Sequence, residues 1–482
     1  MNTPLRRVSV GFMLLFFALL ANVTYVQAFQ ADELNGRQDN RRVVLDEYSR
    51  ERGPILVAET PVARSVSTED EFEYLRQYPE GPLYAHATGY YSFLFGRAAM
   101  ERAENDVLAG TDDRLFVRRL VDLVTGREAR GGSVKLTLDP SAQRAAYDGL
   151  GSQKGAVVAI DTTTGALLAM ASTPTYDPNP LASHSVTEQQ EAWDSLTNDP
   201  DRPMLNRAIA QTLPPGSVFK IVTSAAALES GRYTPDSVIP GPAEYQLPQS
   251  TRTLPNQSGQ PCGPGGETTL TNALRISCNT AFAYLGNDLG DDALREQAER
   301  FGYNSQPLPE MNAATSVFPD DLDAPQTALS AIGQFDVRAT PLEIAMTSAA
   351  VANRGVLMRP YLVEEILGPD LAVIDQTQPS ELSRAMSAET ARDLTAMMVD
   401  VVENGTGGNA AIPGVPVAGK TGTAQSSADR PPYAWFTSFA PADDPRVAVA
   451  VVIEEAGENT DISGGRLAAP VARAVMEAVL GS

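Results

Sequence analysis

The strongest constraint on the fold of this chain is the order and spacing of three short motifs. They are Ser217-Val218-Phe219-Lys220, Ser277-Cys278-Asn279 and Lys420-Thr421-Gly422-Thr423. A serine beside a lysine is a common arrangement for nucleophilic catalysis. The intervals between the motifs, 60 and then 143 residues, argue against a chance combination. If the motifs act together, the fold has to bring three distant segments into one site.

The distribution of lysine supports a catalytic role for two of these motifs. The chain contains only four lysines, which are Lys135, Lys154, Lys220 and Lys420. Arginine stays protonated in proteins, whereas lysine becomes a base once its pKa is lowered. A neutral Lys220 at pH 7 requires burial or a nearby cation, because the ordinary lysine pKa is about 10.4. We identify Lys420 as a candidate for that cation.

The first motif is predicted to begin a helix. Pro214-Pro215-Gly216 cannot continue a helix, and the sequence favours a helix over residues 218–230 that ends at Gly231. Ser217 then lies at the helix N-terminus, where free N–H groups favour a developing anion. Ser217 and Lys220 are three residues apart and hence share a face. On its own, Ser217 would more commonly be a helix cap.

The other two motifs are less specific when each is taken alone. Ser277 could relay a proton and Asn279 could hold a peptide carbonyl, although both residue types often cap helices. Lys420 is predicted to open a strand, in which Gly422 would let a substrate backbone lie close as an added strand. Lys420, Thr421 and Thr423 suit a carboxylate, and the alternative is a hairpin strand with an exposed lysine. Together the motifs predict a serine acyl-enzyme.

Composition excludes several other functions. The net charge of −23 argues against nucleic-acid binding, which needs a basic surface. The only histidines, His86 and His184, lie in no triad-like setting, so a Ser-His-Asp mechanism is not expected. The histidines and the two cysteines lack metal-ligand spacing. We therefore expect no metal and no cofactor.

The N-terminus is predicted to cross a membrane. Arg6 and Arg7 precede an apolar run, residues 8–29, that is about the ~20 residues a membrane helix needs. The basic residues place residues 1–7 in the cytoplasm, and residues 30–482 outside it. The alternatives are a signal peptide cleaved after Val26-Gln27-Ala28 and a buried helix of a soluble protein.

Export bears on the cysteines. Cys262 and Cys278 are the only two, and an even number in an oxidising compartment favours a disulfide. Such a bond would tether the Pro- and Gly-rich segment 250–266 to the second motif. The alternative is two unrelated thiols, since free cysteine is often simply buried.

Strands are predicted near both ends of the second part of the chain. Two apolar runs, 155–160 and 166–171, flank a turn, and two more, 434–439 and 447–453, flank another. The intervening residues 217–405 are helix-rich, and residues 468–480 predict a closing helix. Before them, residues 133–138 predict a strand, and Asp139 a helix N-cap. The pattern indicates an α+β fold with one antiparallel sheet covered by helices.

The three motifs resemble those of the class B penicillin-binding proteins, which are monofunctional peptidoglycan D,D-transpeptidases. Further segments resemble the family over nearly the whole chain: Arg52-Gly53, Gly89–Ser92, Gly96-Arg97, Gly155–Asp161, Ser172–Asn179, Ser330–Gln334, Thr340–Glu343 and Ala352–Gly355. The cysteine pair and the short N-terminal part resemble the penicillin-binding protein A branch of high-GC Gram-positive bacteria, in which the two cysteines are expected to bond. Phe335 departs from the family, where glycine is usual.

The resemblance implies a domain organisation. Residues 153–482 would form the penicillin-recognising serine transpeptidase fold, an antiparallel sheet flanked by helices with a helix-rich subdomain. Residues 30–152 would form a mixed α/β pedestal, a non-catalytic domain like a dimerisation domain. Residues 8–29 would be the single membrane anchor.

The resemblance also implies a mechanism. Ser217 attacks the penultimate D-Ala carbonyl of a stem pentapeptide, and the backbone N–H groups of Ser217 and Thr423 form the oxyanion hole. D-Ala leaves, and an amine of a neighbouring stem attacks the acyl-enzyme to form a cross-link. β-Lactams acylate the same serine. Catalysis is assigned to Ser217, Lys220, Ser277, Asn279 and Lys420, and substrate binding to Thr421, Gly422 and Thr423.

Partners and alternatives follow from the same resemblance. The substrate would be the stem peptides of peptidoglycan and its lipid-linked precursor. Residues 30–152 look too few for a glycosyltransferase domain, so a separate polytopic SEDS-type glycosyltransferase is expected, with division or elongation proteins. A D,D-carboxypeptidase or β-lactamase would pass the acyl group to water. A β-lactam sensor and a non-catalytic division scaffold are the remaining alternatives, and the intact motifs argue against the scaffold.

Overall fold

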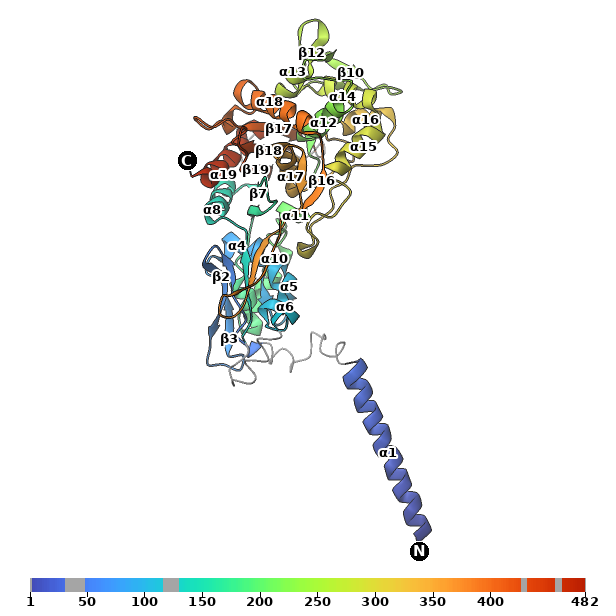
Figure 1. Ribbon diagram of the computed structural model, residues 1–482, viewed down its shortest axis with the longest axis vertical. Coiled ribbons are helices and arrows are strands. Elements are labelled where there is room, and N and C mark those ends of the chain that lie inside the picture. The colour runs from blue at the N-terminus through green and yellow to red at the C-terminus, as the bar shows by residue number, and fades with distance from the viewer. Residues whose placement is uncertain (1, 31–47, 116–129, 426–430, 456–461, 482) are drawn as a thin grey trace.

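The computed structural model describes residues 2–30, 48–115, 130–425, 431–455 and 462–481. The first element is the helix α1, Asn2–Phe29. Its segment Arg6–Ala28 is long and apolar enough to cross a membrane, and none of that segment is buried. Figure 1 shows α1 apart from the other elements. The predicted N-terminal apolar helix is confirmed.

A five-stranded antiparallel sheet forms the centre of the structure. Its strand order is β17-β18-β19-β7-β8. The strands are β7 (Lys154–Asp161), β8 (Leu167–Thr173), β17 (Ala418–Ala424), β18 (Tyr433–Ala440) and β19 (Val447–Glu455). Every residue of β18 is buried, and so are all but the last of β19. Because both faces are covered, β19 is a continuous apolar run from Val447 to Ile453 without alternation. The predicted sheet built from distant segments is confirmed.

Helices cover the two faces of this sheet. The helices α8 (Pro140–Leu150) and α19 (Ala469–Leu480) pack together on one face. Asp139 caps α8 as predicted, because its Oδ1 accepts a hydrogen bond from the backbone N–H of Ala142 at 2.8 Å.

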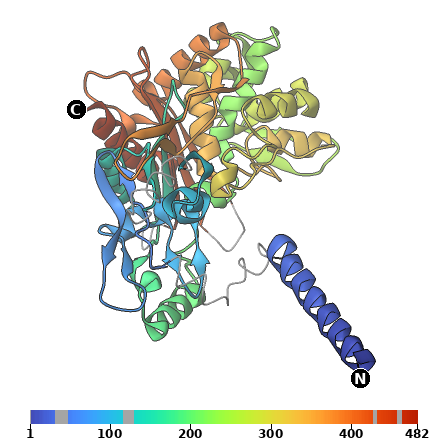
Figure 2. The ribbon, with the colours of Figure 1, turned by 60° about the horizontal axis from the view of Figure 1, so that its bottom comes forward.

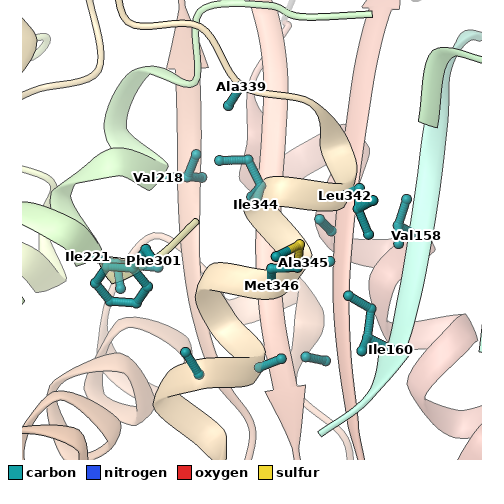
Figure 3. Close-up of a cluster of buried hydrophobic side chains, with 14 of the residues drawn as sticks. Val158, Ile160, Val218, Ile221, Phe301, Ala339, Leu342, Ile344, Ala345 and Met346 are labelled. Carbon is teal, nitrogen blue, oxygen red and sulfur yellow. The ribbon is translucent and has the colours of Figure 1, made fainter. Parts of the chain in front are cut away.

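The helix α17 (Pro341–Ala352) lies on the other face and is buried along its whole length. Figure 3 shows Leu342 and Ile344 of α17 among side chains of β7, such as Val158, and side chains of the first motif's segment, such as Val218. This core therefore joins the sheet to the segment that carries Ser217.

Residues 216–229 are helical, where the sequence predicted a helix over residues 218–230. The segment Gly216–Phe219 is a 3₁₀ turn that continues directly into the helix α12, Lys220–Glu229. Gly216 has φ +55°, which favours glycine. A Cβ atom there would lie 2.9 Å from Ala424 Cβ and 3.0 Å from Thr423 O. The glycine thus lets the serine turn approach β17 closely.

The helix-rich part surrounds α12. It contains α13 (Leu270–Arg275), α14 (Asn279–Leu289), α15 (Asp291–Arg300), α16 (Ala324–Ser330) and α18 (Ala388–Asn404). A short hairpin of β10 (Glu244–Gln246) and β11 (Thr253–Pro255) precedes the loop that leads to Cys262. A disulfide joins Cys262 to Cys278, immediately before α14.

A second sheet is built mainly from strands of the N-terminal part of the chain, such as β2 and β3, which are blue in Figures 1 and 2. Its strand order is β15-β14-β6-β1-β2-β3. The strands are β1 (Ile55–Val57), β2 (Thr60–Ser67), β3 (Tyr74–Gln77), β6 (Ser133–Leu136), β14 (Val363–Leu367) and β15 (Val373–Gln376). The pair β1–β6 is parallel and the other pairs are antiparallel.

Two strands of this sheet come from far along the chain. β14 pairs with β6, so strands from residues 363–376 belong to a sheet whose other strands lie within residues 30–152, the predicted mixed α/β pedestal. The helix α9 (Asn179–Ala182) also joins this part, because Tyr78 N–H donates to Asn179 Oδ1 at 2.9 Å. Segments from both sides of residue 152 therefore contribute to this N-terminal part. The domain boundary at residue 152 remains a prediction.

A buried charge cluster fixes the N-terminal part. The Glu101 carboxylate is fully buried and accepts hydrogen bonds from Arg52 Nε at 2.7 Å, Arg76 Nε at 2.6 Å and Tyr78 OH at 3.1 Å. Burial acts to raise the pKa of Glu101, but the charges of Arg76 and Arg52 outweigh burial and lower it. The carboxylate is thus held ionised at the start of the second sheet.

Candidate active site

The three motifs meet around the hydroxyl of Ser277. Lys220 Nζ donates hydrogen bonds to Ser277 O at 2.8 Å and to Asn279 Oδ1 at 2.7 Å, and it lies 3.3 Å from Ser277 Oγ. Lys420 Nζ donates to Ser277 Oγ at 2.9 Å and to Thr421 O at 2.8 Å. Ser277 Oγ therefore bridges the two lysines. Such a bridge is the geometry expected of a proton relay.

Each group reaches the site from a different element. Lys220 is the first residue of α12, Asn279 is the first residue of α14, and Lys420 lies in β17. Ser277 lies between α13 and α14 with φ +61°, a left-handed conformation that is uncommon for serine. This conformation is held by a hydrogen bond from Cys278 N to Ala273 O at 2.8 Å. Strained residues of this kind often occur at active sites.

Ser217 lies one turn before Lys220 and is more exposed. Lys220 is fully buried, whereas Ser217 is half-buried at the start of the helical segment. The Lys220 amine is held by hydrogen bonds to Ser277 O and Asn279 Oδ1 of the second motif. No described residue makes a hydrogen bond to Ser217 Oγ. Catalytic hydrogen bonds are often long before substrate binds. The serine hydroxyl is thus left accessible to an incoming carbonyl.

The electrostatics of the site favour a neutral Lys220. Burial lowers the pKa of Lys220 well below its ordinary value, and the positive charge of Lys420 lowers this pKa further. Burial lowers the pKa of Lys420 to about 7. The charge of Lys420 therefore lowers the pKa of Lys220, as predicted, but the burial of Lys220 lowers this pKa more.

This arrangement predicts a pH effect for Lys420→Met. The change removes a positive charge, so the pKa of Lys220 rises and less of its amine is neutral at low pH. The acidic limb of the rate of acylation by penicillin, scaled to its plateau, should move to higher pH. Stopped-flow fluorescence with a fluorescent penicillin measures this acylation rate between pH 5 and pH 9. A limb that stays in place, or moves to lower pH, would contradict a charge effect of Lys420.

The strand β17 is an edge strand of the central sheet, since among the described strands it pairs only with β18. An unpaired strand edge can bind an extended peptide as an additional strand. Thr421 is mostly buried, and its Oγ1 lies 2.6 Å from Thr406 Oγ1. Thr406 carries no motif, so sequence analysis could not single it out.

The structure gives Gly422 a second reason to lack a side chain. A Cβ atom at Gly422 would lie 2.9 Å from Trp435 Cβ, 3.0 Å from Val218 Cγ1 and 3.1 Å from Pro215 O. These atoms belong to the neighbouring strand and to the serine segment. The glycine therefore sets the distance between β17 and the serine turn, which the sequence analysis had not considered.

A pocket of about 290 Å³ opens beside the second motif. Its lining includes Asn256, Gln257 and Ser258 from the disulfide-tethered loop, together with Ile276 and Ser277. Phe335, the departure from the family, does not line this pocket, and it lies two residues after Gly333, whose carbonyl accepts a hydrogen bond from Gly216 N at 2.9 Å. It adopts φ +59°, the left-handed conformation that glycine takes at low cost.

Comparison with protein families agrees with this geometry. Residues 155–477 match the penicillin binding protein transpeptidase domain. Residues 52–134 match the penicillin binding protein A dimerisation domain. The first matched segment contains the central sheet and also β14 and β15, and the second contains β1, β2 and β3 of the second sheet.

Individual relatives are similar along the whole chain. The peptidoglycan D,D-transpeptidase PbpA of Mycolicibacterium smegmatis is 48% identical, over 100% of this chain and 99% of that protein. The ceftriaxone acyl-enzyme of penicillin-binding protein A from M. tuberculosis is 45% identical with a TM-score of 0.88, over 90% of this chain and 100% of that one. The penicillin G acyl-enzyme of the same protein is 44% identical with a TM-score of 0.85, over 89% of this chain and 100% of that one.

Proposed function

The chain belongs to the penicillin-binding protein transpeptidases, and we propose that it cross-links peptidoglycan through an acyl-enzyme on Ser217. It is a peptidoglycan D,D-transpeptidase of the serine type. The observation that carries the assignment of residues is the buried Lys220 amine. That amine is held against Ser277 and Asn279, one helical turn from the half-buried Ser217. A neutral amine in this position is suited to accept the serine proton.

Acylation then proceeds as follows. Ser217 Oγ attacks the carbonyl carbon of the penultimate D-Ala residue, and its proton passes to neutral Lys220. The backbone N–H groups of Ser217 and Thr423 stabilise the oxyanion. The bond to the terminal D-Ala nitrogen breaks, and this nitrogen takes a proton through Ser277 Oγ, which bridges Lys220 and Lys420.

Deacylation reverses the roles of the groups. The amine of a second stem peptide attacks the ester carbonyl, loses a proton through the same relay, and Ser217 Oγ recovers its proton.

The donor peptide pairs with the free edge of β17, where Thr421, Gly422 and Thr423 face it. Lys420 and the Thr421 and Thr423 hydroxyls bind the terminal carboxylate, and Asn279 holds a peptide carbonyl. β-Lactams acylate Ser217 in place of the donor.

The rest of the chain supports this activity from a membrane. α1 is proposed as an uncleaved anchor, with residues 1–7 in the cytoplasm and the catalytic part on the extracytoplasmic side. Residues 30–152, completed by β14 and β15, act as a pedestal, and residues 153–482 as the transpeptidase domain. A polytopic SEDS-type glycosyltransferase supplies glycan strands from the lipid-linked precursor, together with division or elongation proteins.

The fate of the acyl group separates transpeptidation from its alternatives. We expect the full-length protein in detergent, given a thioester analogue of an acyl-D-alanine donor, to transfer the acyl group to an added D-amino acid. The amide product should increase with the concentration of the acceptor while the hydrolysis product falls. Liquid chromatography with mass detection measures both products.

The alternatives give different results in the same assay. Hydrolysis at all acceptor concentrations would indicate a D,D-carboxypeptidase, and rapid turnover of penicillin would indicate a β-lactamase. Ser217→Ala is the control and should give neither product. No product from the unmodified chain would leave only the non-catalytic scaffold.

A further inference from the structure

The N-terminus of α14 is capped from outside its own segment. The first backbone N–H groups of a helix have no partner within the helix. In α14, the N–H groups of Asn279 and Thr280 both donate to the side-chain Oδ1 of Asn256, at 3.0 Å and 3.1 Å. Asn256 is 6% exposed. One buried amide thus holds the backbone of the residue whose side chain accepts the Lys220 hydrogen bond.

The other side of the same amide holds the disulfide-tethered loop. Asn256 Nδ2 donates to Pro242 O at 2.9 Å and to Gln260 O at 2.9 Å. The loop is also fastened at Cys262, which is bonded to Cys278 and donates its backbone N–H to Gly241 O at 2.8 Å. Asn256 therefore joins the loop and the second motif through bonds made by both of its polar atoms.

We propose that Asn256 is a positioning residue for acylation, which acts through Asn279 and Ser277 without contact with the reacting atoms. This inference rests on the proposed function. In the described part of the chain, the atoms within hydrogen-bond reach of Lys220 Nζ are Ser277 O, Ser277 Oγ and Asn279 Oδ1, and they belong to the segment 277–279 that Asn256 caps. If the cap is lost, the segment can shift relative to Lys220 and Ser217. A small misplacement of catalytic groups is costly in rate.

The chain offers a matched control in Asn272. Its Nδ2 donates to Cys262 O at 3.0 Å and to Thr268 Oγ1 at 2.8 Å, so it fastens the same loop. It makes no hydrogen bond to residues 277–280 among those described. Asn256→Ala and Asn272→Ala thus remove comparable loop contacts, and only the first removes the cap of α14.

The test uses the full-length protein in detergent and a fluorescent penicillin. The final amount of adduct counts the active sites, and the rate constant for acylation is expressed per active site. We expect Asn256→Ala to lower this rate constant roughly ten- to hundredfold, and Asn272→Ala to keep it close to wild type. A loss of stability alone reduces the number of active sites and the melting temperature, but not the rate per site.

A second pair of variants covers the case in which Asn256→Ala gives no active sites. Asn256→Leu and Asn272→Leu keep roughly the side-chain volume and remove both polar atoms of the amide. Only Asn256→Leu should lower the rate per site, because only this change removes the acceptor of the Asn279 and Thr280 N–H groups. Equal effects in both members of the folded pair, or no effect at Asn256, would overturn the inference while wild type still forms the adduct. Wild-type protein that forms no adduct would overturn the proposed function as well.

Discussion

Lys220→Ala is expected to lower the rate constant of acylation by penicillin about 10³-fold, the range typical of a general base. The reason is that the Lys220 amine lies one helical turn from Ser217 and that burial lowers its pKa well below the ordinary value. Without it, the serine proton has no nearby acceptor. The substitution also leaves Ser277 O and Asn279 Oδ1 without their donor, so the melting temperature has to be measured beside the rate.

A second substitution distinguishes two possible roles of Lys220, that of a base and that of a positive charge. Lys220→Arg keeps a cation but cannot provide a neutral base, because arginine remains protonated. We expect Lys220→Arg to be as inactive as Lys220→Ala. Lys135→Ala is a matched control, since Lys135 pairs with Glu364 and Glu365 in the second sheet, away from the site. If Lys220→Arg kept most of the wild-type rate, Lys220 would act through its charge and not as a base.

Much of the central sheet could be predicted from sequence, for a physical reason. Strands that are covered on both faces consist of continuous apolar residues, such as those of β7 and β19, and turn residues separate them. The helix that begins beside Ser217 was predicted because proline and glycine mark its start. Local chemistry determines these features, so they can be recognised without tertiary information.

The second sheet could not be predicted in the same way. β14 and β6 pair although more than 220 residues separate them, and neither strand carries a signal that names its partner. β14 is half-buried over its first residues and contains Glu364 and Glu365, so its pattern differs from that of a core strand. Long-range strand pairing depends on the packing of the whole chain, and the sequence-based division into two consecutive domains therefore missed it.

The candidate active site likewise contains residues that could be predicted from the sequence and residues that could not. Motif residues were identified because their residue types and order are distinctive. Asn256 and Thr406 were not, because a single amide or hydroxyl in a polar loop has no distinctive pattern and gains meaning only from its neighbours. The reason for Gly422 was likewise incomplete, since the contact with Val218 exists only in the folded chain.

Ser217→Ala is expected to abolish covalent labelling by penicillin altogether. An alanine side chain has no atom that can form the ester, and the neighbouring Ser277 hydroxyl is engaged with Lys420 and Lys220. Unlike the lysine variants, Ser217→Ala removes no hydrogen bond that the described residues make with this side chain. The fold and the melting temperature should therefore remain close to wild type.

The most direct test of the acyl-enzyme is the intact mass of the full-length protein after incubation with penicillin, followed by peptide mapping. We expect the wild-type mass to increase by the mass of one penicillin, carried by the peptide that contains Ser217. Ser277→Ala should still gain this mass, more slowly, whereas Ser217→Ala should gain none. An adduct that persists in Ser217→Ala, or that maps to Ser277, would contradict the assignment of Ser217 as the nucleophile.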